Sequence, residues 1–545
     1  MTDARSTKHL ARHLTTGGGL VISFAVLLAT VAAGRAAELK FPLLWQTDLQ
    51  SFLESSGLVA DLRGDGCEEA VIAGREDLFA LDGQGKVLWR WRCKGRFMTY
   101  PAVLTRPGQL SLVYAADYGG RLNCVDGAGK EVWQAKLNGP SSWSACVVCD
   151  LKGDGDFEVI QTDETGAVWA MSALTGKVLW QTKIKGIPVS PAVGDLDGDG
   201  KPEIAVATGQ GIVTALSGDG RVLWERSIGG SSPSWATAAP VLFAGSDGRG
   251  RVAAASSSGE LLCLDSKGDV LWRRPTRGAA ASTISVGDLN LDGRADICLV
   301  TQTGVIHRFD EDGRAIWEID MQGRSLAPGA IIDLNGDGKL EYVLCTQDGF
   351  LQVLNDQGEF LHRFHFSNRT INVTPTFGKL SADSPVLEML ITGGESGIAF
   401  CLGTPAATNA VAQWKSYRCD TRNSGSWFGL RRTEAVRMAP VNLAAAACAR
   451  ADRLPDQRDR GDSASIGGCA HVLGRCCVGC AAGAGRDRHA GHSVPGQPGI
   501  MAGYGFGGGE TWRASDQAAF AGAQWRRRAR CAEASSYCAA TGNGG

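Results

Sequence analysis

The sequence predicts an all-β protein: a β-propeller of about eight four-stranded blades, followed by a non-repeat C-terminal tail. Two observations lead to this fold class. One short segment recurs with a closing aromatic residue every 44 to 48 residues, and short apolar runs separated by turn residues fill the intervals. Four strands per roughly 45 residues is typical of one propeller blade.

The recurring segment has the pattern of a β-hairpin. Copies include LFALDGQGKVLW (78–89), LNCVDGAGKEVW (122–133) and LLCLDSKGDVLW (261–272), and each copy has a glycine four residues before its closing residue. Glycine supplies the backbone freedom that a tight turn between two strands needs. Two further apolar runs precede each hairpin, as in SPAVGDLDGDGKPEIAVAT (190–208).

The closing aromatic positions give the number of blades. They are Trp89, Trp133, Trp180, Trp224, Trp272, Trp317 and His362. Trp45 precedes this series by one period and Trp414 follows it, so nine positions bound eight intervals. We expect the strand at Trp45 to pair into the last blade and close the ring, which removes exposed sheet edges. The alternative is seven blades with an irregular closing segment. In either case the tryptophan rings are expected to pack between neighbouring blades.

The N-terminal segment predicts export. A sparse positive start is followed by an apolar run over 19–34 and by small residues up to Ala37. This order is typical of a secretory signal peptide over 1–37, and the run is shorter than the roughly 20 residues that a membrane-spanning helix needs. We therefore expect a periplasmic, cell-surface or extracellular protein without a stable transmembrane segment after cleavage. An uncleaved anchor is the alternative.

The composition separates a body, 38–429, from a tail, 430–545. Residues 1–37 carry net +3 and residues 431–545 net +6, which leaves −11 for residues 38–430 within the total of −2. An acidic body argues against a nucleic-acid partner. The tail contains fifteen arginines and no lysine, which indicates either a disordered low-complexity segment or a GC-rich gene translated out of frame. The seventeen cysteines show no regular pairing pattern, so no disulfide scaffold is expected.

A second motif stands between the first two apolar runs of several repeats. DLDGDGKPE, DLNLDGRAD and DLNGDGKLE place oxygen-bearing side chains at positions 1, 3, 5 and 9. Calcium takes six to eight oxygen ligands, and such a loop supplies them from these side chains and from the position-7 carbonyl. The sequence predicts calcium at Asp195, Asp197, Asp199, Lys201 and Glu203; at Asp288, Asn290, Asp292, Arg294 and Asp296; and at Asp333, Asn335, Asp337, Lys339 and Glu341.

Two further copies of the motif are altered at position 3. DLRGDGCEE has Arg63 and DLKGDGDFE has Lys152 there, which removes one ligand and adds a positive charge that could itself neutralise the carboxylates. Weaker calcium sites are therefore expected at Asp61, Asp65 and Glu69, and at Asp150, Asp154 and Glu158. An EF-hand is disfavoured because β-like runs flank the loops and no glutamate stands at position 12.

These residues resemble two overlapping repeat families. VGDLDGDGKPEIAVAT resembles the FG-GAP or VCBS repeats of integrin-type and bacterial surface propellers, and ALSGDGRVLW resembles the PQQ-like repeats of quinoprotein dehydrogenases and of propellers that assist outer-membrane assembly. The first resemblance implies structural calcium loops. The second would imply a quinone cofactor in the central channel, but the adjacent-cysteine disulfide of that family is absent from residues 45–427, so PQQ is not expected.

The expected function is binding. The body shows no HExxH motif and no nucleophilic triad that its sequence would reveal. We expect a monomeric, non-catalytic, calcium-binding scaffold that contacts a protein or a glycan through a propeller face. A PQQ-dependent dehydrogenase or a polysaccharide-active propeller enzyme is the alternative function.

Overall fold

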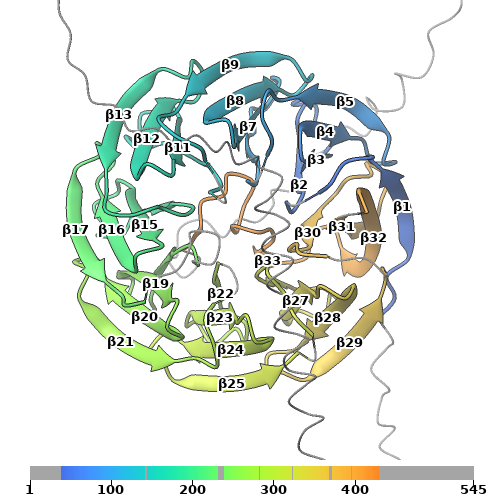
Figure 1. Cartoon of the computed structure of the whole chain (residues 1–545). Helices are drawn as coiled ribbons and strands as arrows, with labels where there is room; N and C mark the ends of the chain where they lie inside the picture. The colour runs from blue at the N-terminus through green and yellow to red at the C-terminus, as the bar shows by residue number, and fades with distance from the viewer. Residues whose placement is uncertain are drawn as a thin grey trace, which may run out of the picture. The chain divides into compact units, whose positions relative to one another are not determined.

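The computed structural model describes residues 39–428, with gaps at 54, 98, 142–143, 231–237, 281–282, 322, 368–370 and 395. The predicted signal peptide, 1–37, and the tail, 430–545, lie outside the described residues. Eight mainly antiparallel sheets are arranged in a ring around a central region, here called the channel, so the predicted propeller has eight blades rather than seven (Figure 1).

Within each blade the first strand lies nearest the channel and the fourth lies at the rim. The strands of blades 1 to 4 are β2 (Leu58–Ala60), β3 (Glu69–Ala73), β4 (Asp77–Leu81) and β5 (Val87–Arg92); β6 (Ala102–Leu104), β7 (Leu112–Asp117), β8 (Arg121–Asp126) and β9 (Glu131–Lys136); β10 (Val147–Cys149), β11 (Glu158–Thr162), β12 (Ala167–Ser172) and β13 (Val178–Lys183); and β14 (Ala192–Gly194), β15 (Glu203–Thr208), β16 (Ile212–Leu216) and β17 (Val222–Ser227).

Blades 5 to 8 follow the same order, and blades 5 and 7 each have one extra strand at the channel. Their strands are β18 (Val241–Ala244), β19 (Gly250–Ser256), β20 (Glu260–Asp265) and β21 (Val270–Pro275); β22 (Ser285–Gly287), β23 (Asp296–Val300), β24 (Val305–Asp310) and β25 (Ala315–Asp320); β26 (Ala330–Ile332), β27 (Glu341–Cys345), β28 (Phe350–Leu354) and β29 (Phe360–His365); and β30 (Thr376–Gly378), β31 (Val386–Gly393), β32 (Ile398–Ala407) and β1 (Leu43–Asp48).

The ring closes as predicted, because the N-terminal strand completes the last blade. β1 pairs antiparallel with β32, with Trp45 opposite Cys401. The two ends of the propeller sequence thereby share one sheet, and no blade is left incomplete at the junction.

The repeating tryptophans join neighbouring blades, as expected. The indole Nε1 of Trp89 donates to the carbonyl oxygen of Gly127 in blade 2 at 2.9 Å, and Trp224 makes the equivalent bond to Ser266 at 2.8 Å. The turn glycine of the next blade accommodates the ring: a Cβ at Gly129, where φ is +84°, would lie 2.6 Å from Trp89. This contact explains why the glycine and the tryptophan recur together.

Burial decreases from the channel to the rim. The second and third strands of the blades are almost wholly buried, whereas most rim strands alternate between exposed and half-buried residues. Apolar clusters between successive blades form the core. Among the described residues there is no helix that could span a membrane, and no disulfide joins the ten cysteines that the structure describes.

The chain returns to the channel after the last blade. Residues 411–428, here called the channel segment, include β33 (Ala412–Trp414), which pairs with β26, and β34 (Ser426–Trp427), which pairs parallel to β18 (Figure 1). This corrects the sequence interpretation of Trp414. The residue does not close a blade at the rim; it lies wholly buried beside the first strand of blade 7, and Trp45 takes the rim position of blade 8.

Candidate functional site

The five carboxylate loops lie on one side of the propeller. Each joins the first strand of its blade to the second, in blades 1, 3, 4, 6 and 7. Because the strands alternate in direction, the turns between the third and fourth strands lie on this side too. We call this side the loop face.

The five loops share one hydrogen-bonding frame. The backbone N–H at position 2 donates to the carboxylate at position 9 over 2.8 to 2.9 Å in every copy. The position-9 residues Glu69, Glu158, Glu203, Asp296 and Glu341 are at most 5% exposed. One backbone hydrogen bond does not offset the cost of a buried charge, so each carboxylate needs a cation or a proton.

In blades 1 and 3 the residue at position 3 provides that cation. An Nη of Arg63 lies 2.7 Å from Glu69, and Nζ of Lys152 lies 2.8 Å from Glu158. Hydrogen bonding to Glu158 raises the pKa of Lys152. These side chains therefore stand where the sequence motif would place a metal ligand.

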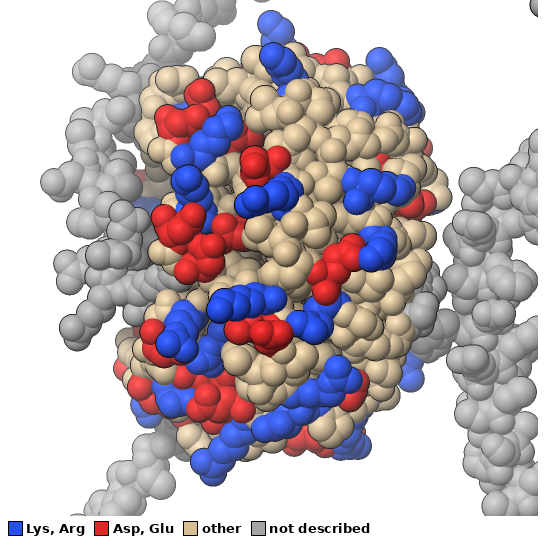
Figure 2. Space-filling view, turned by 90° about the vertical axis from the view of Figure 1, so that its left-hand side faces the viewer, with Lys and Arg blue, Asp and Glu red and all other residues tan. Residues whose placement is uncertain are grey.

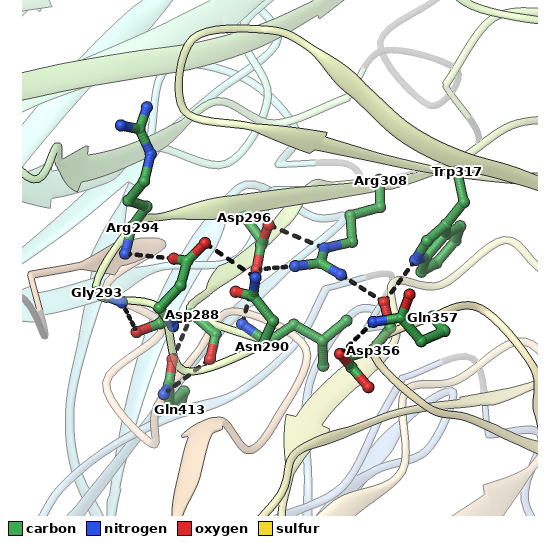
Figure 3. A network of polar contacts seen from close by, with 12 residues as sticks. Asp288, Asn290, Gly293, Arg294, Asp296, Arg308, Trp317, Asp356, Gln357 and Gln413 are labelled. Atoms are coloured by element: carbon green, nitrogen blue, oxygen red, sulfur yellow. Dashed lines mark hydrogen bonds and ion pairs between the residues drawn. The ribbon is translucent and has the colours of Figure 1, made fainter.

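In blade 6 the cation comes from the third strand of the blade. Arg308, on β24, donates two hydrogen bonds to Asp296, at 2.9 and 2.8 Å, and both side chains are buried (Figure 3). A bidentate pair of this kind is the strongest form of carboxylate neutralisation available to a side chain. Asp288 accepts from the backbone N–H of Gly293, while the Asn290 amide donates to Asp292. The Arg294 side chain extends away to the next turn, where it pairs with Glu311 and Asp312.

In blade 4 three carboxylates of the loop converge. Ligand oxygens of Asp195, Asp197 and Glu203 lie within 4.8 Å of one another. Burial, together with the charges of Asp197 and Asp199, raises the pKa of Glu203 to about 7. Among the described residues, no basic side chain forms an ion pair with Glu203. The Lys201 side chain is exposed, and its backbone N–H donates to Asp199.

Blade 7 is intermediate between these cases. The Asn335 amide donates to Glu341 at 3.1 Å and to Asp337 at 3.2 Å, so a neutral group takes the place of the cation. Asp333 accepts from two backbone N–H groups of the loop, and Lys339 donates its backbone N–H to Asp337. Burial and the neighbouring acids raise the pKa of Glu341 to about 7. Its carboxylate is therefore short of positive charge, as that of Glu203 is.

Two components of this arrangement were not found in the sequence. Arg308 lies twelve residues beyond Asp296, and only the register of β23 with β24 shows that they are close. The channel segment follows the last repeat and carries no motif of its own. It reaches the loops at Gln413, whose side-chain oxygen accepts from the backbone N–H of Asp288 at 2.6 Å (Figure 3).

Known proteins match this chain in its repeat region. Residues 104–242 and 209–349 match the family model described as outer membrane protein assembly factor BamB. BamB of Yersinia pestis is 25% identical over 210 residues, which are 34% of this chain and 51% of that protein, so the chain spans about half the length of this curated relative.

The chain also resembles two solved structures. BamB from Moraxella catarrhalis is 14% identical with a TM-score of 0.48, and the match covers 67% of this chain and all of that one. A quinohemoprotein alcohol dehydrogenase from Pseudomonas putida is 13% identical with a TM-score of 0.47, covering 67% and 76%. The chain is thus an eight-bladed β-propeller, and the family match within residues 104–349 supports PQQ-like repeats in that part of it.

Proposed function

We propose that this protein is an exported, non-catalytic scaffold that binds a protein partner through its loop face and holds calcium in part of that face. The observation that carries the proposal is the position of residues 411–428, which run along the channel wall and bond to most of the blades. The channel is where a propeller would hold a small ligand. With its wall occupied by the chain itself, the outer surfaces are the surfaces that a partner can reach.

The loop face has the properties of a preorganised contact surface. Its turns are held by side chain to backbone hydrogen bonds, such as those from the Lys86 and Lys130 backbones to Asp82 and Asp126. Many of its loop and turn positions are acidic, which favours a partner with a basic surface. On the rim of blades 3 to 5, by contrast, acidic and basic side chains are interspersed (Figure 2). The relative named as an outer-membrane assembly factor supports a protein partner in the cell envelope.

We propose calcium first for the loop of blade 4 and next for that of blade 7. The support is internal to the chain: where the position-9 carboxylate has Arg63, Lys152 or Arg308 beside it, the loop contains its own cation. Glu203 and Glu341 have the same buried position, and no basic side chain of the described residues forms an ion pair with either. A divalent cation would offset their charge and gather the oxygens of positions 1, 3 and 5. The blade 6 loop keeps Asp288, Asn290 and Asp292 as ligands, and we expect weaker binding there because Arg308 engages Asp296.

A pair of matched crosslinking variants tests the binding face. Gln357 and Gln302 are both exposed glutamines in turns, the first on the loop face and the second on the opposite face. A photoreactive residue at position 357 is expected to give one discrete protein adduct in cells of the source organism, whereas the same residue at position 302 gives none. A discrete adduct from position 302 alone, a glycan adduct, or alcohol-dependent dye reduction by the purified protein with added quinone would contradict the proposal.

A further inference from the structure

The channel segment is bonded to the blades in the way that a bound peptide is. Its carbonyl oxygens accept hydrogen bonds from the first strands of several blades, at 2.8 to 3.2 Å. The donor N–H groups belong to Val103, Val148, Val193, Leu242 and Phe377, and the acceptors are the carbonyls of Thr421, Arg422, Ser424, Gly425 and Lys415. Each donor is the second residue of its strand, so the segment satisfies the same channel-facing N–H in blades 2, 3, 4, 5 and 8. This is strand addition to sheet edges that would otherwise face the channel.

The side chains of the segment are anchored on different blades. Arg418 is wholly buried and donates to the carbonyl oxygens of Pro191 and Pro240 and to the hydroxyl of Thr283. The Asn423 amide donates to the carbonyl oxygens of Pro101 at 2.8 Å and Cys146 at 3.3 Å. These two side chains together thus contact blades 2, 3, 4, 5 and 6.

Aromatic contacts fix the segment just before the first of these two anchors. Tyr417 stacks on Tyr100, which precedes the first strand of blade 2, with ring centroids 3.6 Å apart. Trp414 is wholly buried in the apolar cluster that includes Ile331. Four side chains of the segment therefore contact the blades, in the order tryptophan, tyrosine, arginine and asparagine.

The backbone of the segment is shaped by its surroundings. Cys419 and Asn423 have φ values of 76° and 57°, a region that non-glycine residues rarely occupy and that surrounding contacts must impose. The segment forms no sheet of its own, because β33 and β34 are three and two residues long. Its link to β32, the third strand of blade 8, is a turn at 407–411 whose residues are exposed or half-buried. Most of what holds the segment is therefore its contact with the blades.

We propose that the channel is a binding site for an extended peptide, and that residues 411–428 occupy it in cis as a separable ligand. The ligand class is an extended segment whose backbone adds to the first strands and whose buried arginine and asparagine bind blade carbonyls. The ring of blades and the segment then unfold in two steps, with release of the segment first. This inference depends neither on calcium nor on the partner of the loop face.

Hydrogen exchange in the unmodified full chain tests the proposal. The N–H groups of Val103, Val148, Val193, Leu242 and Phe377 are expected to exchange together, at a urea concentration below that at which the second strands of the same blades open. Exchange of these five amides only in step with the second strands would show that the segment is an inseparable part of the fold. Five unrelated exchange rates would also overturn the proposal.

Two arginines of the segment provide a matched pair of variants. Arg418→Gln removes bonds from a buried side chain, whereas Arg422→Gln changes an exposed one. Arg418→Gln is expected to accelerate exchange at all five amides by roughly tenfold or more, and Arg422→Gln to leave it unchanged. Equal effects of the two variants would contradict the proposal.

A cleaved form of the chain covers the case in which Arg418→Gln does not fold. A protease site inserted in the turn at 407–411 allows the folded chain to be cut there. The segment is expected to stay bound, to leave in moderate urea while the blades persist, and to be replaced by a labelled synthetic peptide of residues 410–428. Loss of the blades together with the segment, or failure of that peptide to bind, would overturn the proposal.

Discussion

Glu203→Gln is expected to change stability in opposite directions with and without calcium. The parent Glu203 carboxyl has its pKa raised from 4.5 to about 7, first by burial and then by Asp197 and Asp199. A raised carboxyl pKa means that the folded state holds the Glu203 proton more tightly than the unfolded state does. The resulting contribution to stability is fully present below pH 4.5 and is lost as the pH rises through 7. At about 1.4 kcal/mol per pKa unit, the ionised group costs the calcium-free fold up to roughly 3 kcal/mol above pH 7.

The amide keeps the acceptor for the Leu196 backbone N–H but carries no charge. At pH 8 with a chelator, Glu203→Gln is therefore expected to be more stable than the parent by about 1 to 3 kcal/mol. With excess calcium the variant is expected to be less stable than the parent. Calcium that binds only the folded state stabilises it, and the amide binds calcium more weakly than the carboxylate does. Thermal and urea unfolding in both conditions measure these differences.

The matched control is Glu158→Gln in blade 3, where Lys152 already provides the positive charge. Its effect on unfolding is expected to be the same with calcium and with chelator. The reasoning would be refuted if Glu203→Gln were no more stable than the parent in chelator at pH 8, or if its advantage were as large at pH 5.

Three further changes follow from the same contacts. Lys152→Asp restores the position-3 ligand and is expected to add one calcium site, counted by equilibrium dialysis; an unchanged count would contradict it. Arg308→Met leaves the buried Asp296 unpaired and should cost about 3 to 5 kcal/mol in urea unfolding, part of it recovered by calcium; a loss below 1 kcal/mol would refute the role of that pair. Gly268 has a φ of +80°, and Gly268→Ala places a Cβ 2.6 Å from the Trp224 ring. This variant should lose about 1 to 3 kcal/mol of stability in the same assay. Gly66 has a similar φ of +85° but no neighbour that a Cβ would meet, so Gly66→Ala should lose less.

The sequence predicted the repeat well because one physical contact recurs in it. The rim tryptophan and the turn glycine of the next blade must be present together, so their spacing gave the blade number and the closure by β1. Trp414 was misplaced because a tryptophan one long period after His362 has the same pattern whether it lies at the rim or in the channel. Only its pairing with Ile331 distinguishes the two positions.

The positions of the loop carboxylates could be predicted from the sequence, but not all of the groups that neutralise their charge could be. Spacing alone identified the carboxylates, and it showed that Arg63 and Lys152 could neutralise them. The Arg308 pair depends on the register between β23 and β24, and the buried position of Glu203 depends on packing between blades. Local patterns do not encode either contact. The channel segment was missed for the same reason, since all its partners are distant in the sequence.

Calcium titration of chelator-treated protein, followed by calorimetry, tests the central claim most directly. The loops of blades 4 and 7 are expected to give two tight sites, with weaker binding in blade 6. Asp197→Asn should remove or weaken the tightest site, and Asp154→Asn in blade 3 should leave both tight sites unchanged. Absence of calcium binding, or a tightest site that is lost in Asp154→Asn and kept in Asp197→Asn, would contradict the account.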